Sequence, residues 1–212
     1  MNKKAQPKAG GKGGADGAAK PRVISHRAPV GEVRIIGGQW KRTKLAVPDR
    51  PGLRPTPDRV RETLFNWLGQ DLTGWQCMDA FAGTGALGLE AASRGASLVT
   101  LIESDAGLVK RLEDTCQKLG ATQVQVRRGD GVAAMKRMTP ASLDLVFLDP
   151  PFDGDLFDAA LAAAKALLRT DGKVYLEAPE LWSDERLAAL GLVTVKQIKA
   201  GAVFAHLLTA TP

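Results

Sequence analysis

Short apolar runs alternate with segments of helical periodicity from residue 76 onward. Repeated strand–helix units of this length predict an α/β fold, with a mostly parallel sheet and helices on both of its faces. Only Ala200-Gly201 joins the last two strands, so they should form a hairpin that leaves one strand near the sheet edge antiparallel. The expected strands are 76–81, 97–103, 123–128, 143–148, 173–177, 192–198 and 203–208, and the expected helices are 85–94, 105–119, 131–138, 155–169 and 184–190.

Two short strands are expected before this sheet. Residues 33–36 and 40–47 have strand-like apolar positions on either side of Gly37-Gly38, which predicts a β-hairpin. The second strand would carry three basic residues, Lys41, Arg42 and Lys44.

A linker and a further helix should follow the hairpin. Four prolines between residues 48 and 57 predict an extended segment. Thr56 is a plausible N-cap with Pro57 in the first helical position, and Gly69 is a reasonable stop. An apolar stripe at Val60, Leu64, Trp67 and Leu68 supports the helix between them.

The first 30 residues have a different composition. They consist largely of Gly, Ala, Lys and Pro, which cannot bury enough apolar surface to offset the entropy of ordering. We therefore expect a disordered basic tail at 1–30, an N-terminal β-hairpin with its linker at 31–55, and the sheet domain at 56–212.

Positive charge is concentrated at the N-terminal end. Residues 1–50 hold 12 Lys and Arg against three acidic residues, whereas the remainder of the chain holds 17 against 20. This asymmetry favours a polyanionic partner for the N-terminal part. Charge alone is equally consistent with a tail that only raises solubility.

The rest of the composition excludes several classes of protein. Two Cys and two His rule out a disulfide scaffold and a Cys-rich zinc module, and leave little room for a His-based metal centre. No apolar run approaches the ~18–20 residues of a membrane span, and the N-terminus has no apolar signal region. We expect a cytoplasmic protein with no metal and no membrane partner.

A glycine-rich turn follows the first strand of the sheet. Gly83, Gly85 and Gly88 fit the G-x-G-x-x-G pattern, and Glu103 follows Gly83 by 20 residues at the end of the next strand. A carboxylate there can accept hydrogen bonds from two ribose hydroxyls, so the loop fits a nicotinamide cofactor or any other adenosine-bearing ligand. A tight turn without a ligand is the alternative.

Two more acidic residues lie at the carboxyl ends of strands. Asp79 comes just before the glycine turn, and Asp130 follows the third strand. Open α/β sheets bind ligands at this edge. Either residue could instead cap a helix, and for Asp130 the two interpretations are equally good.

The most informative motif is Asp149-Pro150-Pro151-Phe152, at the end of the strand 143–148. The two prolines stiffen the loop and leave the Asp149 side chain and the Pro150 carbonyl as acceptors on a rigid turn. Acceptors beside an aromatic ring suit a flat group that carries an amine, such as a nucleobase.

Together these motifs carry a family resemblance that covers about 31–210. The chain resembles S-adenosylmethionine-dependent nucleic-acid methyltransferases and, more closely, the RsmD type, which modifies a guanine N2 in small-subunit (16S) ribosomal RNA. The segments that carry it are Arg34-Ile35-Ile36-Gly37-Gly38-Gln39-Trp40, Pro51-Gly52-Leu53-Arg54-Pro55-Thr56, Asp58-Arg59-Val60-Arg61-Glu62-Thr63-Leu64-Phe65-Asn66-Trp67-Leu68, Asp79-Ala80-Phe81-Ala82-Gly83-Thr84-Gly85-Ala86-Leu87-Gly88-Leu89-Glu90, Ile102-Glu103 and Asp149-Pro150-Pro151-Phe152.

The resemblance implies a Rossmann-like class I methyltransferase fold with a seven-stranded sheet, S-adenosylmethionine as cofactor, and ribosomal RNA within the small subunit as partner. Nothing in the sequence demands an interface between subunits, so we expect a monomer. Its catalytic residues would be Asp149, Pro150, Pro151 and Phe152. Its cofactor-binding residues would be Arg54, Thr56, Asp79, Phe81, Gly83, Gly85, Glu103, Asp130 and Gly131, and its RNA-binding residues Arg34, Lys41, Arg42, Lys44 and Arg59.

Three other functions remain open at this point. Asp-Pro-Pro-aromatic loops also serve DNA adenine-N6 methylation, and a basic N-terminus does not separate RNA from DNA. A nicotinamide-dependent oxidoreductase would explain the glycine loop but not the Asp149 motif or the basic hairpin. A catalytically silent RNA-binding module would explain the charge alone.

Overall fold

The structure is a computed structural model that describes residue 1 and residues 31–49, 56–151 and 156–211. The expected disordered tail, most of the proline-rich linker with Arg54, and Phe152 therefore lie outside the described residues.

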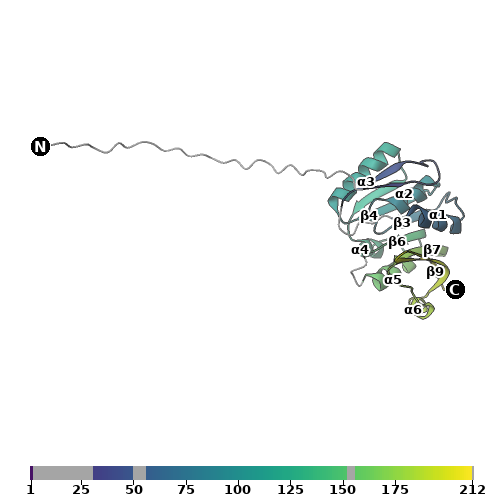
Figure 1. Cartoon of the computed structure of the whole chain (residues 1–212). Helices are drawn as coiled ribbons and strands as arrows, with labels where there is room; N and C mark the ends of the chain where they lie inside the picture. The colour runs from purple at the N-terminus through teal and green to yellow at the C-terminus, as the bar shows by residue number, and fades with distance from the viewer. Residues whose placement is uncertain (2–30, 50–55, 152–155, 212) are drawn as a thin grey trace.

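A seven-stranded sheet forms the centre of the molecule (Figure 1). Its strand order is β5-β4-β3-β6-β7-β9-β8, and neighbours from β5 to β7 pair in parallel. β9 is antiparallel to both β7 and β8, which confirms the antiparallel strand near the edge. The strands are β3 (Gln76–Asp79), β4 (Leu98–Glu103), β5 (Val124–Arg128), β6 (Leu143–Leu148), β7 (Leu168–Ala178), β8 (Leu192–Ala200) and β9 (Val203–Ala210).

Helices cover both faces of the sheet, as the alternating pattern predicts. One apolar cluster packs the first three helices and the N-terminal hairpin against one face, and the other cluster packs the remaining helices against the opposite face. The first group is α1 (Asp58–Trp67), α2 (Ala86–Ser93) and α3 (Ala106–Leu119), and the second is α4 (Gly131–Lys136), α5 (Phe157–Leu167) and α6 (Asp184–Ala189). None of the helices in the described ranges is long and apolar enough to cross a membrane.

The expected N-terminal hairpin is present, but its turn is longer than the pattern predicts. β1 (Gly31–Arg34) pairs antiparallel with β2 (Lys44–Val47), so residues 35–43 form the connection. Lys41 and Arg42 consequently lie in the turn and not on the second strand, where only Lys44 remains. Gly38 has φ +71°, and a Cβ there would lie 1.8 Å from the Ser93 carbonyl oxygen, so glycine lets the turn press against α2.

Two helix boundaries also differ from the expectation. α1 has Pro57 and not Thr56 at its N-cap, with no side-chain capping bond, because the Thr56 hydroxyl bonds to a distant strand residue, Glu177. α5 ends at Leu167, and β7 begins at Leu168, five residues earlier than expected. Asp171, with φ +64°, and Gly172 lie in an irregular stretch of β7 where the register against β6 shifts. Such residues are typical of a turn, so the first five residues of β7 were not apparent from the sequence, whereas the strand expected at 173–177 is present.

Candidate active site at the carboxyl edge of the sheet

Three acidic residues converge where neighbouring parallel strands end. Asp79 is the last residue of β3, Asp149 directly follows β6, and Glu177 lies near the end of β7. Because β3, β6 and β7 are adjacent in the sheet, the three carboxyl groups share one edge. Asp79 and Glu177 are only 2% and 4% exposed. Asp79 and Asp149 are among the residues predicted from the sequence, whereas Glu177 is not, although an acid at the end of the apolar strand residues Val174–Leu176 is the same signal.

The surroundings of these carboxyl groups disfavour their negative charge. Burial raises the pKa of Asp79 to about 7, and the charges of nearby Glu103 and Glu177 raise it further. Hydrogen bonds from the backbone N–H groups of Gly88 and Phe81 act in the opposite direction but are outweighed. Burial also raises the pKa of Asp149, as do the charges of Glu177 and Asp79. A positively charged ligand at this edge would reverse the imbalance, because an opposite charge favours the ionised form.

Glu177 is held by two hydroxyl groups. The Thr56 hydroxyl donates to Glu177 Oε1 at 2.5 Å, and the Tyr175 hydroxyl donates to the same oxygen at 2.9 Å. Burial and the charge of Glu177 raise the pKa of Tyr175, so its hydroxyl keeps its proton and remains a donor. This arrangement ties the start of α1 to the strand next to Asp149.

The glycine loop is tied to the carboxylate at the end of β4. Gly83 N–H donates to Glu103 Oε2 at 2.9 Å, while Asp105 N–H donates to Glu103 Oε1 at 2.8 Å. Gly85 has φ +79° at the N-cap of α2, a conformation that favours glycine. Glu103 is therefore oriented by backbone donors and keeps further acceptor capacity on both oxygens.

The loop after β5 approaches the same edge. Asp130 caps α4 by accepting a hydrogen bond from Ala133 N–H at 2.7 Å, which bears out the capping interpretation; its cofactor role stays a prediction. A Cβ on Gly131 would lie 2.2 Å from the Ala80 carbonyl oxygen. Glycine thus lets this loop lie directly against the loop after β3, beside Phe81.

A buried ionic network joins the hairpin to this domain. Glu90 on α2 accepts hydrogen bonds from the backbone N–H groups of Ile36 and Gly37, both at 2.8 Å. It also forms ion pairs with Arg61 at 3.2 Å and Arg94 at 2.8 Å. Arg61 and Glu90 are fully buried. Neither was selected as a functional residue from the sequence, because their burial becomes apparent only when the hairpin is docked.

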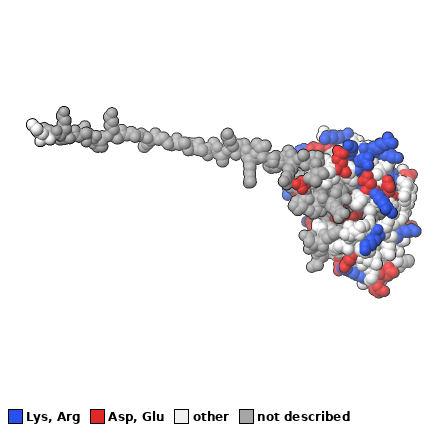
Figure 2. Space-filling model, in the orientation of Figure 1, with Lys and Arg blue, Asp and Glu red and all other residues white. Residues whose placement is uncertain are grey.

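The predicted RNA-binding residues are exposed on the surface. Lys44 pairs with Glu32 at 2.8 Å, and Arg34 lies 4.0 Å from Asp58, whereas Lys41, Arg42 and Arg59 form no ion pair within the described ranges. Blue side chains gather at the end of the domain formed by α3 and the hairpin (Figure 2). The structure therefore places Lys41 and Arg42 in the hairpin turn, which packs on Ser93 at the C-terminal end of α2, and places Arg34 and Arg59 beside the start of α1. No group of three potential metal ligands occurs among the residues that the structure describes.

Comparisons with known proteins agree with this architecture. The family described as "Conserved hypothetical protein 95" matches residues 33–209. Ribosomal RNA small subunit methyltransferase D of Escherichia coli is 42% identical over 178 residues, which cover 78% of this chain and 89% of that protein. The Haemophilus influenzae protein of the same name is 37% identical over 179 residues, covering 78% and 93%.

The chain belongs to this RsmD-type methyltransferase family. Solved structures support the assignment. A putative methyltransferase of Escherichia coli, yhhF, is 34% identical with a TM-score of 0.72, and the match covers 85% of this chain and 99% of that one. A putative methylase of Haemophilus influenzae is 33% identical with a TM-score of 0.69, covering 86% and 100%. The Rossmann-like fold and the methyltransferase class are thereby confirmed.

Proposed function

We propose that this chain transfers a methyl group from S-adenosylmethionine to the exocyclic N2 of a guanine in small-subunit (16S) ribosomal RNA, in the assembled subunit. The observation that carries the proposal is the position of Asp149 on its Pro-Pro turn, between Asp79 and Glu177 on the neighbouring strands. The names of the relatives support ribosomal RNA as the substrate.

The residues present fit S-adenosylmethionine. When bound, this cofactor supplies an electrophilic methyl group on a positively charged sulfonium. Burial and acidic neighbours raise the pKa of Asp79 and that of Asp149, so both carboxyl groups lack a compensating positive charge. The sulfonium would supply that charge and favour their ionised forms. Glu103, oriented by Gly83 N–H and Asp105 N–H, is placed to accept hydrogen bonds from ribose hydroxyls.

Other cofactor contacts follow from the loops. Asp79 and Phe81, with Gly83 and Gly85, would hold the methionine end, and Asp130 and Gly131 would border the adenine. The close approach of Gly131 to Ala80 gives that border its shape. Thr56 and Arg54 would cover the cofactor from the N-terminal side, and Arg54 lies outside the described residues.

The role of Asp149 is orientation of the target amine. Guanine N2 is a poor nucleophile because its lone pair is delocalised into the ring. Hydrogen bonds from its two protons to the Asp149 carboxylate and the Pro150 carbonyl would turn the lone pair toward the methyl group. Alignment of this kind can contribute several kcal/mol, up to about 7–11 kcal/mol for well-aligned reactants. The raised pKa of Asp149 also suits a group that receives a proton after transfer. Phe152, outside the described residues, would stack on the base.

Recognition of RNA is assigned to the N-terminal part. Arg34, Lys41, Arg42, Lys44 and Arg59 would contact phosphates, which position the RNA without reading its sequence. A base inside an RNA helix must first flip out to reach Asp149. We propose that residues 31–55 serve as the RNA-binding hairpin and linker, that 56–212 carry out transfer, and that the chain works as a monomer on cytoplasmic ribosomes.

A methyl-transfer assay tests the proposal. The full-length chain is incubated with labelled S-adenosylmethionine and small ribosomal subunits that lack the modification, with free ribosomal RNA and duplex DNA in parallel. The expected product is N2-methylguanosine, formed best on the assembled subunits. Label in N6-methyladenine of DNA would mean that the Asp149 motif serves adenine methylation in DNA and not guanine methylation in RNA. Cofactor binding without any transfer would indicate a silent RNA-binding module.

A matched pair of variants tests the role of Asp149. Asp149→Ala should lower turnover by about a hundredfold or more, because the side-chain acceptor for the target amine is lost, while cofactor affinity measured by calorimetry stays close to wild type. Asp184→Ala, at an exposed position on α6, should leave both unchanged. Lost cofactor affinity in Asp149→Ala would instead assign Asp149 to the cofactor site.

A further inference from the structure

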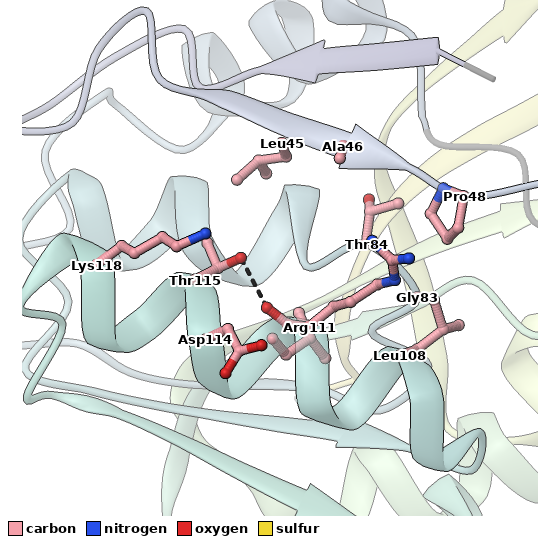
Figure 3. Close-up of a pocket in the computed structure, with 11 residues that line it drawn as sticks. Leu45, Ala46, Pro48, Gly83, Thr84, Leu108, Arg111, Asp114, Thr115 and Lys118 are labelled. Atoms are coloured by element: carbon pink, nitrogen blue, oxygen red, sulfur yellow. Dashed lines mark hydrogen bonds between the residues drawn. The ribbon is translucent and has the colours of Figure 1, made fainter. Parts of the chain in front are cut away.

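A pocket of about 150 Å³ lies between the hairpin, the glycine loop and α3 (Figure 3). β2 contributes Leu45 and Ala46, and Pro48 follows the strand. Gly83 and Thr84 close one end, and α3 forms the opposite wall. The pocket is therefore continuous with the exposed basic hairpin on one side and with the candidate cofactor loop on the other.

Two cations of α3 line this pocket. Figure 3 shows the Arg111 side chain extending toward Thr84 and Gly83, and Lys118 lying one helical turn beyond Thr115. Neither Arg111 nor Lys118 forms an ion pair with any residue that the structure describes. Asp114 also lines the pocket; Lys110 binds its carboxylate at 2.9 Å, and the nearby charges of Lys118 and Arg111 also lower the pKa of Asp114. The lining thus holds two cations and one carboxylate, a net positive charge.

The accessible lining of the pocket is more polar than apolar. Leu45, Leu108 and Leu112 contribute to its walls but are almost fully buried, so they offer a ligand little apolar surface. Unpaired cations on an open, largely polar surface match the anionic backbone of a nucleic acid, because phosphates supply most of the charge that such surfaces bind.

We propose that this pocket binds the backbone of the substrate RNA outside the target guanine, with one phosphate on Arg111 and another on Lys118. The proposal rests on the RNA-methylating function above and extends the RNA-binding surface from the hairpin onto α3. It assigns α3 a role in substrate binding that the residues predicted from the sequence do not include.

The spacing of Arg111 and Lys118 favours RNA over the carboxylate of the cofactor as the anion that this pocket binds. The cofactor carries one carboxylate, and Arg111 beside Gly83 and Thr84 is near enough to the glycine loop to raise that alternative. Lys118, however, lies about two helical turns from Arg111 along α3, beyond the reach of a single carboxylate. A chain of phosphates can occupy both cations, and the exposed hairpin cations continue its path.

Steady-state kinetics on small ribosomal subunits at several salt concentrations test the pocket. Arg111→Gln should raise the KM for subunits about three- to tenfold and flatten the dependence of log KM on log salt by about 0.7–0.9, as expected when one phosphate contact is lost. Lys118→Gln should act in the same direction. Ala46→Trp, at an exposed position of β2, should raise the KM by filling the pocket without changing any charge.

Controls separate this proposal from its rivals. Lys196→Gln removes the same charge from β8, at the opposite edge of the sheet, and should leave the KM and the salt dependence unchanged. Cofactor affinity, measured by calorimetry, should be unchanged in Arg111→Gln. A weakened cofactor affinity would overturn the proposal and assign the pocket to the cofactor's carboxylate. An unchanged KM and salt slope would also overturn it.

The two proposals can fail separately. If wild-type protein methylates no guanine N2, the proposed reaction is wrong, and equilibrium binding of the same variants to small subunits and to free ribosomal RNA still decides the role of the pocket. Weaker, less salt-dependent binding by Arg111→Gln than by Lys196→Gln supports the RNA site. Equal binding by the two variants refutes it.

Discussion

Replacing Glu90 with glutamine tests whether the buried ionic network holds the hairpin on the domain. Oε2 of Glu90 accepts from Ile36 N–H at 2.8 Å and from Arg61 at 3.2 Å, and Oε1 accepts from Gly37 N–H and Arg94, both at 2.8 Å. The substitution changes one oxygen into an NH₂ group and hardly alters the volume. Each oxygen of Glu90 accepts one hydrogen bond from a backbone N–H and one from an arginine. Whichever oxygen becomes the NH₂ group of glutamine, that group faces two donors, so both of these hydrogen bonds are lost.

The structure sets the size of the expected effect. Glu90 and Arg61 are both 0% exposed, so the arginine charge would remain buried with less compensation. Removing one partner of a buried pair costs about 3–5 kcal/mol. Asp58 at 2.6 Å and the Arg34 carbonyl at 2.7 Å still bind Arg61, which argues against a larger value. For a chain of this size the melting temperature should fall by about 6–20 °C.

Urea unfolding and thermal melts of the full-length chain measure this effect. Amide hydrogen exchange should also accelerate at Ile36 and Gly37, which lose their acceptor. Glu113→Gln, at an exposed position on α3, is the matched control and should stay within about 0.5 kcal/mol of wild type. A loss below about 1 kcal/mol in Glu90→Gln, with unchanged exchange at both amides, would refute the reasoning from buried charge.

Three further predictions concern the carboxyl edge. Gly131→Ala places a Cβ 2.2 Å from the Ala80 carbonyl oxygen and should cost about 1–3 kcal/mol by urea unfolding. Calorimetry should show weaker cofactor binding in the same variant. Because the pKa of Asp79 rises from 3.8 to about 7 on folding, the folded state holds more protons between these values, and the free energy of unfolding should fall by up to about 4 kcal/mol as pH rises through that window. Asp79→Asn should flatten this profile in urea titrations at several pH values, and an unaltered profile would exclude Asp79 as its source. Tyr175→Phe removes one of the two hydroxyl donors to buried Glu177 and should cost about 1–3 kcal/mol of stability, with a fall in kcat larger than any change in cofactor affinity. Equal kcat in the variant and wild type would limit Tyr175 to a purely structural role.

Much of the architecture follows from local pattern. The alternation of apolar runs with helical periodicity predicts the strands and their parallel arrangement, because each element must bury one face on the same sheet. The glycine turn at 83–88 and the Asp149-Pro150 turn are recognisable because glycine and proline restrict the backbone wherever they occur. Errors were concentrated where local signals point elsewhere, as at Asp171-Gly172, which reads as a turn but lies within β7.

The candidate site was predicted only where each residue has its own local signal. Asp79, Glu103 and Asp149 stand at strand ends beside distinctive turns, so sequence placed them at one edge. Glu177 also ends an apolar strand segment, but neither a glycine loop nor an Asp-Pro-Pro motif stands beside it. Its connection to Thr56 spans 121 residues, and nothing near Thr56 in the sequence indicates that its hydroxyl leaves the helix cap for β7.

The sequence by itself determined the strand–helix order, the glycine loop, the Asp149 turn and the basic N-terminal end, because these depend on backbone preference and hydrophobic period within a few residues. Tertiary structure alone decided that Glu177 joins Asp79 and Asp149, that Arg61 and Glu90 pair in the interior, and that Arg111 lines a pocket beside the hairpin. Each of these features exists only when segments far apart in the chain pack together. A charge becomes buried, or a cation becomes part of a pocket wall, only after another element covers it.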